Sequence, residues 1–317
     1  MKQPEISVCI VTCNQQKYIR QCVESAIAQA VDVTLEILVG DDCSDDNTGA
    51  IVAEIAALHP EIVRHIRHDS RLGACRNIQA VIAQAKGKFI AHLDGDDYWL
   101  PGKLKQQLIF ITRDADCVAV YTNARTVNET GSPIGLFNNV GNQRFDLAAL
   151  LRRGNFLNTS SMMIRSELKS QLLEIDGPFI DYRMHLRHAR KGFVAQLGQS
   201  LVGYRVNSVG SMVSGANDLV RQLYWEAIMD VPRELVTDAD FACGLADFLR
   251  RVFFRALRTR RWRLLRDWAP HVFRASPHGV GRTFFLTLWS ILRTIWIEIV
   301  GRLQIGSGRP VKVLYRR

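Results

Sequence analysis

The chain lacks the cysteine pattern of a disulfide-linked or zinc-binding domain. Its 317 residues include seven cysteines, an odd number, and no two of them form a CxxC pair. Most stand among apolar neighbours, which is typical of reduced thiols in a cytoplasmic protein. The first residues, MKQPEISVCIVTC, hold only a short β-rich apolar run that polar residues follow at once. We therefore expect a first strand there and no signal peptide.

Acidic residues are nearly absent from residues 250–317. That segment holds 16 Arg or Lys residues against Asp267 and Glu298, a net charge of +14, whereas residues 1–249 carry a net charge of −4. The overall charge of +10 therefore belongs to the C-terminal segment. An acidic partner for that segment, such as anionic lipid or nucleic acid, is a separate question from the function of the first 249 residues.

Low complexity and disorder are also absent, since 47% of the residues are hydrophobic and 23% are charged. The length favours one large α/β domain with an appendage. Strand-like segments at 6–12, 35–39 and 63–66 alternate with helical apolar patterns at 18–27, 44–57 and 76–85. This alternation predicts a doubly wound, mostly parallel sheet whose functional site lies at the carboxyl ends of its strands.

Three carboxylates stand within four positions of the segment FIAHLDGDDYWLP, residues 89–101. Asp94, Asp96 and Asp97 directly follow a short apolar strand. Like charges this close raise one another's pKa and repel unless a cation lies among them. Mg²⁺ or Mn²⁺ fits best, because such ions bind one or two carboxylates and add water and phosphate oxygens. The pattern indicates a metal and diphosphate site, and a solvated acidic turn is the competing interpretation.

Four segments in series carry a resemblance to a known family. They are VCIVTCNQQKYIRQCVESAIAQ, EILVGDDCSDDNT, LGACRN and AHLDGDDYWLPGKL, within residues 5–110. In this order and spacing they are similar to the donor-binding half of family 2 glycosyltransferases. The resemblance implies a GT-A fold, a Rossmann-like doubly wound sheet, over residues 1–216. Its donor half would span about 5–110 and its acceptor half about 111–216. The resemblance stops at about Asn217, and the residue pattern of 217–317 predicts a basic α-helical C-terminal extension.

The resemblance also implies the residues that bind the donor and the metal. They are Thr12, Asp42, Arg76, Asp94 and Asp96. Asp42 would contact the base or ribose of the nucleotide with Thr12 beside it, and Asp94 would lie near the ribose. Asp96 would hold the divalent cation, which neutralises charge on the leaving diphosphate. Arg76 matches a basic position near the diphosphate, and a surface role on its helix is an equal alternative.

The segment FIDY, residues 179–182, resembles the motif that supplies the family's catalytic base. Ile180 stands where the first acid of that motif is usual, so Asp181 is the expected base. A helix N-terminal carboxylate, worth about 0.3–1 kcal/mol through the helix dipole, is the competing interpretation.

Three further positions bear on the resemblance. Tyr204 and Arg205, with Ser208–Met212, are similar to a closing segment that often lies over the donor phosphates. Cys43 replaces the glycine usual after Asp42, and Asn207 replaces a frequent histidine.

The C-terminal region contains two segments that could contact a membrane. Residues 250–266, RRVFFRALRTRRWRLLR, read as a surface helix whose Arg reaches phosphates while Trp and Phe enter the interface, with a basic helix packed on the enzyme as the alternative. Residues 283–300 are long and apolar with one narrow polar face, but Arg293 would cost roughly 2.5–3.5 kcal/mol at a bilayer centre. We expect this helix to lie in the interface, ahead of dimer packing and of spanning.

The resemblance implies an inverting, hexosyltransferase-type glycosyltransferase, and the tail suggests an acceptor linked to lipid. The enzyme would move a sugar from a nucleotide-diphosphate sugar, UDP being the commonest in the family, to a hydroxyl of a saccharide or lipid-linked saccharide in bacterial surface polysaccharide biosynthesis. We expect a metal-dependent cytoplasmic protein, peripheral on the cytoplasmic face of the inner membrane, with a homo-oligomer as an alternative use of the tail.

Two other functions compete with this prediction. A metal-dependent nucleotidyltransferase normally has a Gly-rich loop with lysine after its first strand, and CNQQKY is not such a loop. A nucleic-acid-binding protein would use the basic tail, but the front half is acidic and the aromatic residues of the tail look buried. We therefore expect no nucleic-acid partner.

Overall fold

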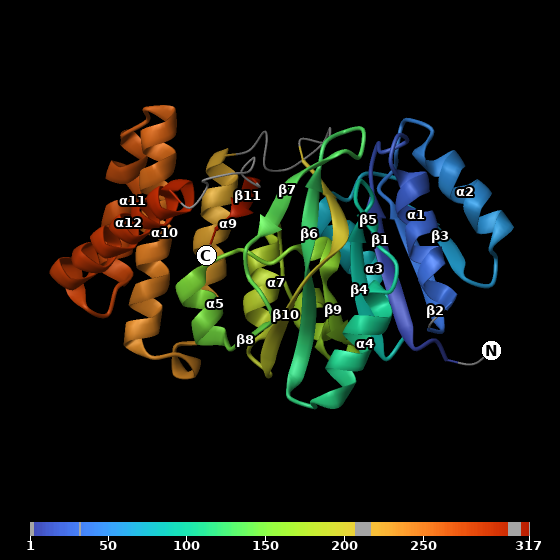
Figure 1. Cartoon of the computed structure of the whole chain (residues 1–317), viewed down its shortest axis with the longest axis horizontal. Helices are drawn as coiled ribbons and strands as arrows, with labels where there is room; N and C mark the ends of the chain where they lie inside the picture. Colours follow the sequence, from blue (N-terminus) through green and yellow to red (C-terminus); the bar gives the residue numbers. More distant parts are fainter. Residues whose placement is uncertain (1–2, 32, 207–216, 304–311, 317) are drawn as a thin grey trace.

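The computed structural model describes residues 3–31, 33–206, 217–303 and 312–316. One central sheet runs through the molecule, with helices on its faces and a group of helices at one end (Figure 1). The strands are β1 Ile6–Thr12, β2 Leu35–Asp41, β3 Val63–Arg67, β4 Phe89–Asp94, β5 Tyr98–Trp99, β6 Cys117–Val127, β7 Pro133–Asn138, β8 Gln143–Phe145, β9 Met163–Arg165, β10 Phe193–Arg205 and β11 Lys312–Tyr315. The helices are α1 Ile19–Ile27, α2 Thr48–Leu58, α3 Ala74–Ala83, α4 Lys103–Arg113, α5 Leu147–Arg153, α6 Lys169–Leu173, α7 Asp181–His188, α9 Asn217–Met229, α10 Asp238–Thr259, α11 Arg263–Ala275 and α12 Gly279–Leu303.

The first half is a parallel sheet in the order β4-β1-β2-β3. Side chains alternate across it, so Val8 and Ile10 of β1 pack with α1 and α2 on one face, while Cys9 packs with α3 on the other. This double cover explains why the strand is apolar throughout. The predicted doubly wound, mostly parallel α/β fold is confirmed, and β1, β2, β3 and β4 all end at the edge that carries Asp42 and Asp94.

The second half extends the sheet with antiparallel pairings. Strand β9 lies antiparallel between β4 and β6, and β6 forms a hairpin with β7 and a parallel pair with β10. Strand β9 begins only at Met163, because Thr159–Ser161 before it forms a short 3-10 turn, η2. The hydroxyl of Ser161 accepts the backbone N–H of Thr122, so this turn is fixed to β6.

The prediction of a single helix over residues 250–266 is wrong. Helix α10 ends at Thr259, Arg260 takes a left-handed conformation at φ 56°, and α11 starts at Arg263. Two of its arginines also point inward, since Arg250 and Arg251 both bind the buried carboxylate of Asp247. The first part of the segment is therefore a basic helix packed on the enzyme, which was the alternative interpretation.

Asp247 gives a test of this packing. Asp247→Asn removes the negative charge between two largely buried arginines, so we expect the free energy of unfolding to fall by about 3–5 kcal/mol. The matched control is Asp267→Asn, which breaks the exposed pair with Arg263 and should cost less than about 1 kcal/mol. Urea unfolding measures both, and equal losses would contradict the assignment.

Candidate active site

The acidic turn follows β4 and lies against the end of β1. Gly95 is buried there, and a Cβ atom at this position would come within 2.8 Å of the hydroxyl of Thr12. Only glycine therefore lets the turn approach β1 this closely. The side chains of Asp94 and Asp96 are partly exposed, whereas Asp97 is buried with 2% exposure. The three carboxylates thus divide into two at the surface and one that faces the interior.

The inward carboxylate has two fixed partners. The hydroxyl of Ser160 lies 2.6 Å from Asp97 Oδ2 and 2.9 Å from Asp94 Oδ2, and the backbone N–H of Arg205 donates to Asp97 Oδ1 at 2.8 Å. Burial, together with the charges of Asp96 and Asp94, raises the pKa of Asp97 well above its usual range. The hydrogen bonds from Ser160 and Arg205 oppose this rise, because they stabilise the ionised carboxylate.

Arg205 holds the backbone of this turn. Its Nε donates to the carbonyl of Asp96 at 2.8 Å, and its Nη1 donates to the carbonyls of Asn128 and Glu129. Its guanidinium lies 4.3 Å from the ring centroid of Tyr18. Arg205 is 4% exposed, so it braces the acidic turn from the protein side. The rest of the expected closing segment, Asn207 and Ser208–Met212, lies outside the described residues.

Asp94 is positioned by a histidine that the sequence analysis missed. His92 precedes it by two residues, so both side chains lie on the same face of β4, and His92 Nε2 is 3.1 Å from Asp94 Oδ1. Burial alone would raise the pKa of Asp94, but His92 and the hydroxyl of Ser160 bring it below its usual value. Asp94 therefore remains ionised and oriented.

The residues predicted to bind the nucleotide meet at the ends of β1 and β2. The carbonyl of Thr12 accepts the backbone N–H of Asp42 at 3.0 Å, which places them side by side as predicted. Both carboxylate oxygens of Asp42 accept backbone N–H groups, from Leu72 at 2.6 Å and Gly73 at 2.9 Å. Asp42 thus fixes the loop that leads into α3, and Arg76 is exposed in the first turn of that helix.

In the turn after β2, Cys43 has a backbone conformation that glycine usually adopts. Cys43 has φ 53°, in the left-handed region. The fully buried Asp41 closes the turn, because its Oδ1 accepts hydrogen bonds from the backbone and hydroxyl of Ser44. Cys43 therefore occupies a backbone region that glycine adopts freely, and the cysteine side chain causes local backbone strain there.

Asp181 is the first residue of α7 and lies across from the acidic turn. Asn155 Nδ2 donates to its Oδ1 at 2.8 Å, and the hydroxyl of Thr159 donates to its Oδ2 at 3.1 Å. Burial raises its pKa above the ordinary 3.8, and the charge of Asp94 adds to the rise against these hydrogen bonds. Because Thr159 holds Asp181 and the adjacent Ser160 holds Asp94 and Asp97, η2 brings the expected base and the acidic turn into one site.

The metal prediction rests on the two partly exposed carboxylates of the acidic turn, Asp94 and Asp96. Within the part of the chain that it describes, no cluster of three or more His, Cys, Asp or Glu residues is arranged to hold an ion. Asp97 faces inward, whereas Asp94 and Asp96 are partly exposed at the surface. Two carboxylates are a set that Mg²⁺ accepts when diphosphate oxygens and water complete its shell.

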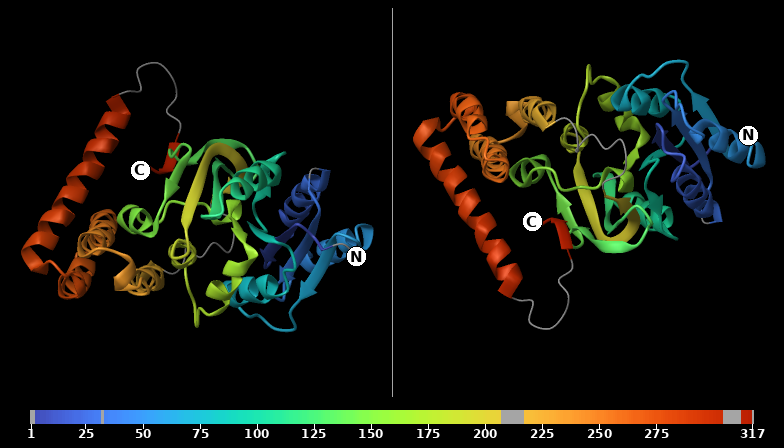
Figure 2. Two further views of the ribbon diagram at one scale, coloured as in Figure 1. Left: turned by 90° about the horizontal axis from the view of Figure 1, so that it is seen from below. Right: turned by 90° about the horizontal axis from the view of Figure 1, so that it is seen from above.

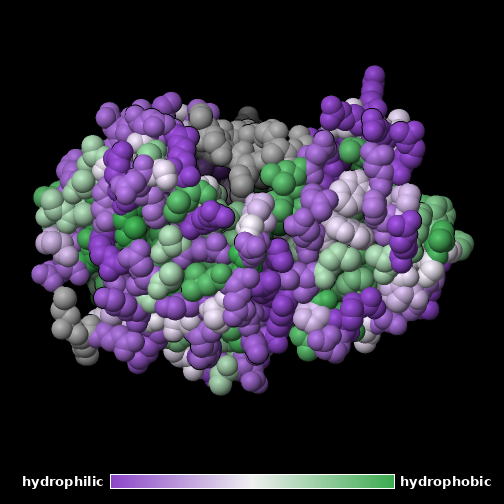
Figure 3. Space-filling model, turned by 180° about the vertical axis from the view of Figure 1, so that it is seen from behind, coloured by the Kyte–Doolittle hydropathy of each residue, from purple (hydrophilic) through white to green (hydrophobic). Residues whose placement is uncertain are grey.

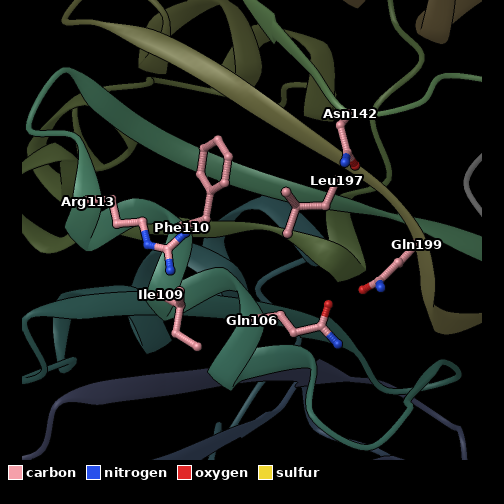
Figure 4. Close-up of a pocket in the computed structure, with 7 residues that line it drawn as sticks. All are labelled: Gln106, Ile109, Phe110, Arg113, Asn142, Leu197 and Gln199. Carbon is pink, nitrogen blue, oxygen red and sulfur yellow. The ribbon is translucent and has the colours of Figure 1, made fainter.

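A separate pocket lies between α4 and β10 (Figure 4). It is lined by Gln106, Ile109, Phe110, Arg113, Asn142, Leu197 and Gln199. The predicted donor, metal and base residues do not line this pocket, and it contains no carboxylate. It is therefore distinct from the site around the acidic turn.

Comparison with known proteins places these features in a family. The model of glycosyl transferase family 2 matches residues 7–171. The uncharacterized protein Rv1520 of Mycobacterium tuberculosis is 30% identical over 223 residues, and the chain spans 64% of its length. The putative teichuronic acid biosynthesis glycosyltransferase TuaG of Bacillus subtilis is 28% identical over 66% of this chain and 82% of that protein.

A solved structure shares the fold. It is S. aureus TarS 1–349 in complex with UDP-GlcNAc, with a TM-score of 0.65 and 19% identity, covering 89% of this chain and 83% of that one. The likeness confirms the predicted GT-A architecture, and the helices α9 to α12 form the expected helical C-terminal region.

Cys43 allows a direct test of the strained turn. Cys43→Gly removes the left-handed strain, so we expect the protein to gain up to about 1 kcal/mol in the free energy of unfolding. Cys43→Val places a β-branched residue at the same φ and should lose more than that. Thermal unfolding of the two variants and the parent checks the order, and a more stable valine variant would refute the turn geometry.

Proposed function

Because the chain belongs to glycosyl transferase family 2, we propose that it is an inverting glycosyltransferase that moves a sugar from a nucleotide-diphosphate sugar to an acceptor hydroxyl. The observation that carries this proposal is the η2 turn. Two consecutive side chains of this turn, Thr159 and Ser160, hydrogen-bond to Asp181 and to the acidic turn respectively. A base and a diphosphate site separated in this way suit attack from the side opposite the leaving group.

We assign the donor to the ends of β1, β2 and β4. Asp42 and Thr12 would contact the nucleoside, because each is fixed by backbone hydrogen bonds at the ends of neighbouring parallel strands. Arg76 is exposed at the start of α3, where a cation can reach a diphosphate. The UDP-GlcNAc named with the TarS structure makes a UDP-sugar the first donor to try.

A divalent cation, Mg²⁺ or Mn²⁺, would be held by Asp96 with Asp94. When bound, such an ion supplies charge neutralisation at a leaving diphosphate. This chain's own residues prepare the site for it, since His92 and Ser160 orient Asp94 and Arg205 fixes the backbone at Asp96. The electrostatic groups are therefore in place before the donor binds.

Asp181 would accept the proton of the acceptor hydroxyl. Its carboxylate is held by Asn155 and Thr159, and burial raises its pKa toward the range in which a carboxylate is an effective base. Tyr182 and Ile180 beside it are buried, so the base projects from a rigid helix start.

The acceptor would be a saccharide or a lipid-linked saccharide of a bacterial surface polysaccharide, used at the cytoplasmic face of the membrane. Two relatives support this choice by name: TuaG, and the chondroitin synthase of Pasteurella multocida, which is 34% identical over 41% of this chain but only 13% of its own length. The basic C-terminal region supports a location beside anionic lipid.

The first prediction concerns the metal. Asp96→Asn should abolish metal-dependent binding of a nucleotide sugar and nearly all transfer, and a chelator should have the same effect on the parent protein. Calorimetry with UDP-sugars and Mn²⁺ measures the binding. The control is Asp116→Asn, an exposed carboxylate in the turn before β6, which should behave as the parent. Full activity in chelator would rule out this metal assignment.

The second prediction concerns the base. Asp181→Asn should keep nucleotide-sugar affinity while the transfer rate falls by roughly 10²–10⁴. Transfer by the parent needs the ionised carboxylate, so its rate should fall as the pH drops through the raised pKa of Asp181, above 3.8. Rate profiles against pH and calorimetry with donor measure the two effects.

Thr159 sharpens this test. Thr159→Val removes a hydrogen bond to the ionised carboxylate of Asp181, so the pKa of Asp181 should rise further. The fall of the transfer rate at low pH, the acidic limb of the rate profile, should therefore move to higher pH. Thr112→Val, whose hydroxyl donates only to carbonyls of its own helix, is the control and should leave the limb in place. Loss of donor binding in step with activity in Asp181→Asn would place Asp181 in the donor pocket instead.

A further inference from the structure

Helix α12 packs with its polar side inward and its apolar side outward. Thr283 and Thr287 are buried at 0% and 6% exposure where α12 meets α10 and α11, and the hydroxyl of Thr283 donates to the carbonyl of Gly279. A helix of a soluble protein normally has the opposite orientation. In Figure 2 this helix runs along the outer edge of the molecule in both views.

The outward side is a continuous apolar surface. Its largest members are Phe284, Phe285, Trp289, Leu292, Trp296 and Ile299, which are between 46% and 69% exposed. Hydrophobic surface is visible at the edge formed by the C-terminal helices (Figure 3). An apolar patch of this kind on a folded protein marks an interaction surface.

The border of this surface is basic. Arg282 and Arg293 are both exposed. Arg282 stands seven residues before Trp289 and Arg293 stands four residues after it, so the three side chains lie along one line of the helix. Further exposed arginines on α10, α11 and the turn between them are Arg258, Arg260, Arg261, Arg266 and Arg274. Aromatic rings bordered by arginine match the acyl boundary and the phosphates of an anionic leaflet.

The connections of α12 favour a helix that lies in the plane of a membrane surface over one that crosses the bilayer. Gly279–Val300 is the one helix within the described residues that is long and apolar enough to cross a bilayer. However, α11 packs against its start, and after its end β11 returns to pair with β7, where Lys312 lies opposite Gly135. A crossing would place α11 and β11 on opposite sides of the membrane and separate β11 from the sheet.

The charge argues against a second copy of the chain as the occupant. Two such faces brought together would oppose Arg282 and Arg293 of one copy to the same arginines of the other, within a segment that holds only Asp267 and Glu298 as acids. Like charges across an interface oppose association. An anionic lipid surface satisfies both the apolar face and its basic border.

We propose that α12 lies in the plane of an anionic membrane surface, with its Phe, Trp and Leu side chains at the acyl boundary and the surrounding arginines on lipid phosphates. This surface is separate from the sugar-transfer site, so it can be tested without donor, acceptor or metal. It would hold the enzyme where a lipid-linked acceptor is presented, and only that consequence rests on the proposed function.

The test uses the full chain added to preformed vesicles of phosphatidylglycerol with phosphatidylcholine, followed by flotation. The double variant Trp289→Ser and Trp296→Ser, at exposed positions, should fold normally and partition at least about tenfold more weakly. The matched control, Leu58→Ser with Val31→Ser, alters exposed apolar residues at the other end of the molecule and should bind as the parent. High salt should weaken the binding of the parent only partially, because the apolar part is not screened.

Three results would overturn the proposal. They are absence of the parent protein from the anionic vesicle fraction, equal binding by the double variant, and equal binding to vesicles of phosphatidylcholine alone. Light scattering tests whether a second copy of the chain occupies this face instead. If the parent protein is a dimer, the double tryptophan variant is a monomer and the parent does not float with vesicles, the face would be assigned to a second copy. Circular dichroism of both double variants confirms that a loss of binding is not a loss of folding.

Discussion

The arrangement of the site depends on holding three aspartates within four positions of one turn. Asp97 is turned inward, where Ser160 and the backbone of Arg205 bind it, while Arg205 also ties down the carbonyl of Asp96. Repulsion is thereby relieved on one side, so Asp94 and Asp96 can present negative charge at the other. Without this bracing from Ser160 and Arg205, the turn would have to spread its charges apart in solvent.

The same bracing explains why the two halves of the domain form one site. The acidic turn belongs to the parallel sheet, whereas Ser160 and Thr159 come from η2 and Arg205 comes from the end of β10. Hydrogen bonds between them join residues that are 66 and 108 positions apart in the chain. Asp181 is hydrogen-bonded by the same turn, so the proposed base and the proposed diphosphate site keep a fixed separation.

The features of the fold and site that depend on local sequence pattern could be predicted. Strands β1 to β4, their helices and the resemblance carried by Asp42, Asp94 and Asp96 follow from periodicity and motif. The inward turn of Asp97 was not predictable, because it depends on distant Ser160 and Arg205. The break at Arg260 has no glycine or proline to signal it, and the pattern of α12 gives two faces without saying which one packs on the protein.

The central claim is that the acidic turn and Asp181 together form one transfer site. Crystals grown with Mn²⁺ and a nucleoside diphosphate, measured at an energy where manganese scatters anomalously, test it most directly. We expect a single strong anomalous peak between Asp96 and the diphosphate, with the nucleoside beside Asp42 and Asp181 facing the open side of the diphosphate. A manganese peak elsewhere, or the nucleotide in the pocket between α4 and β10, would contradict it.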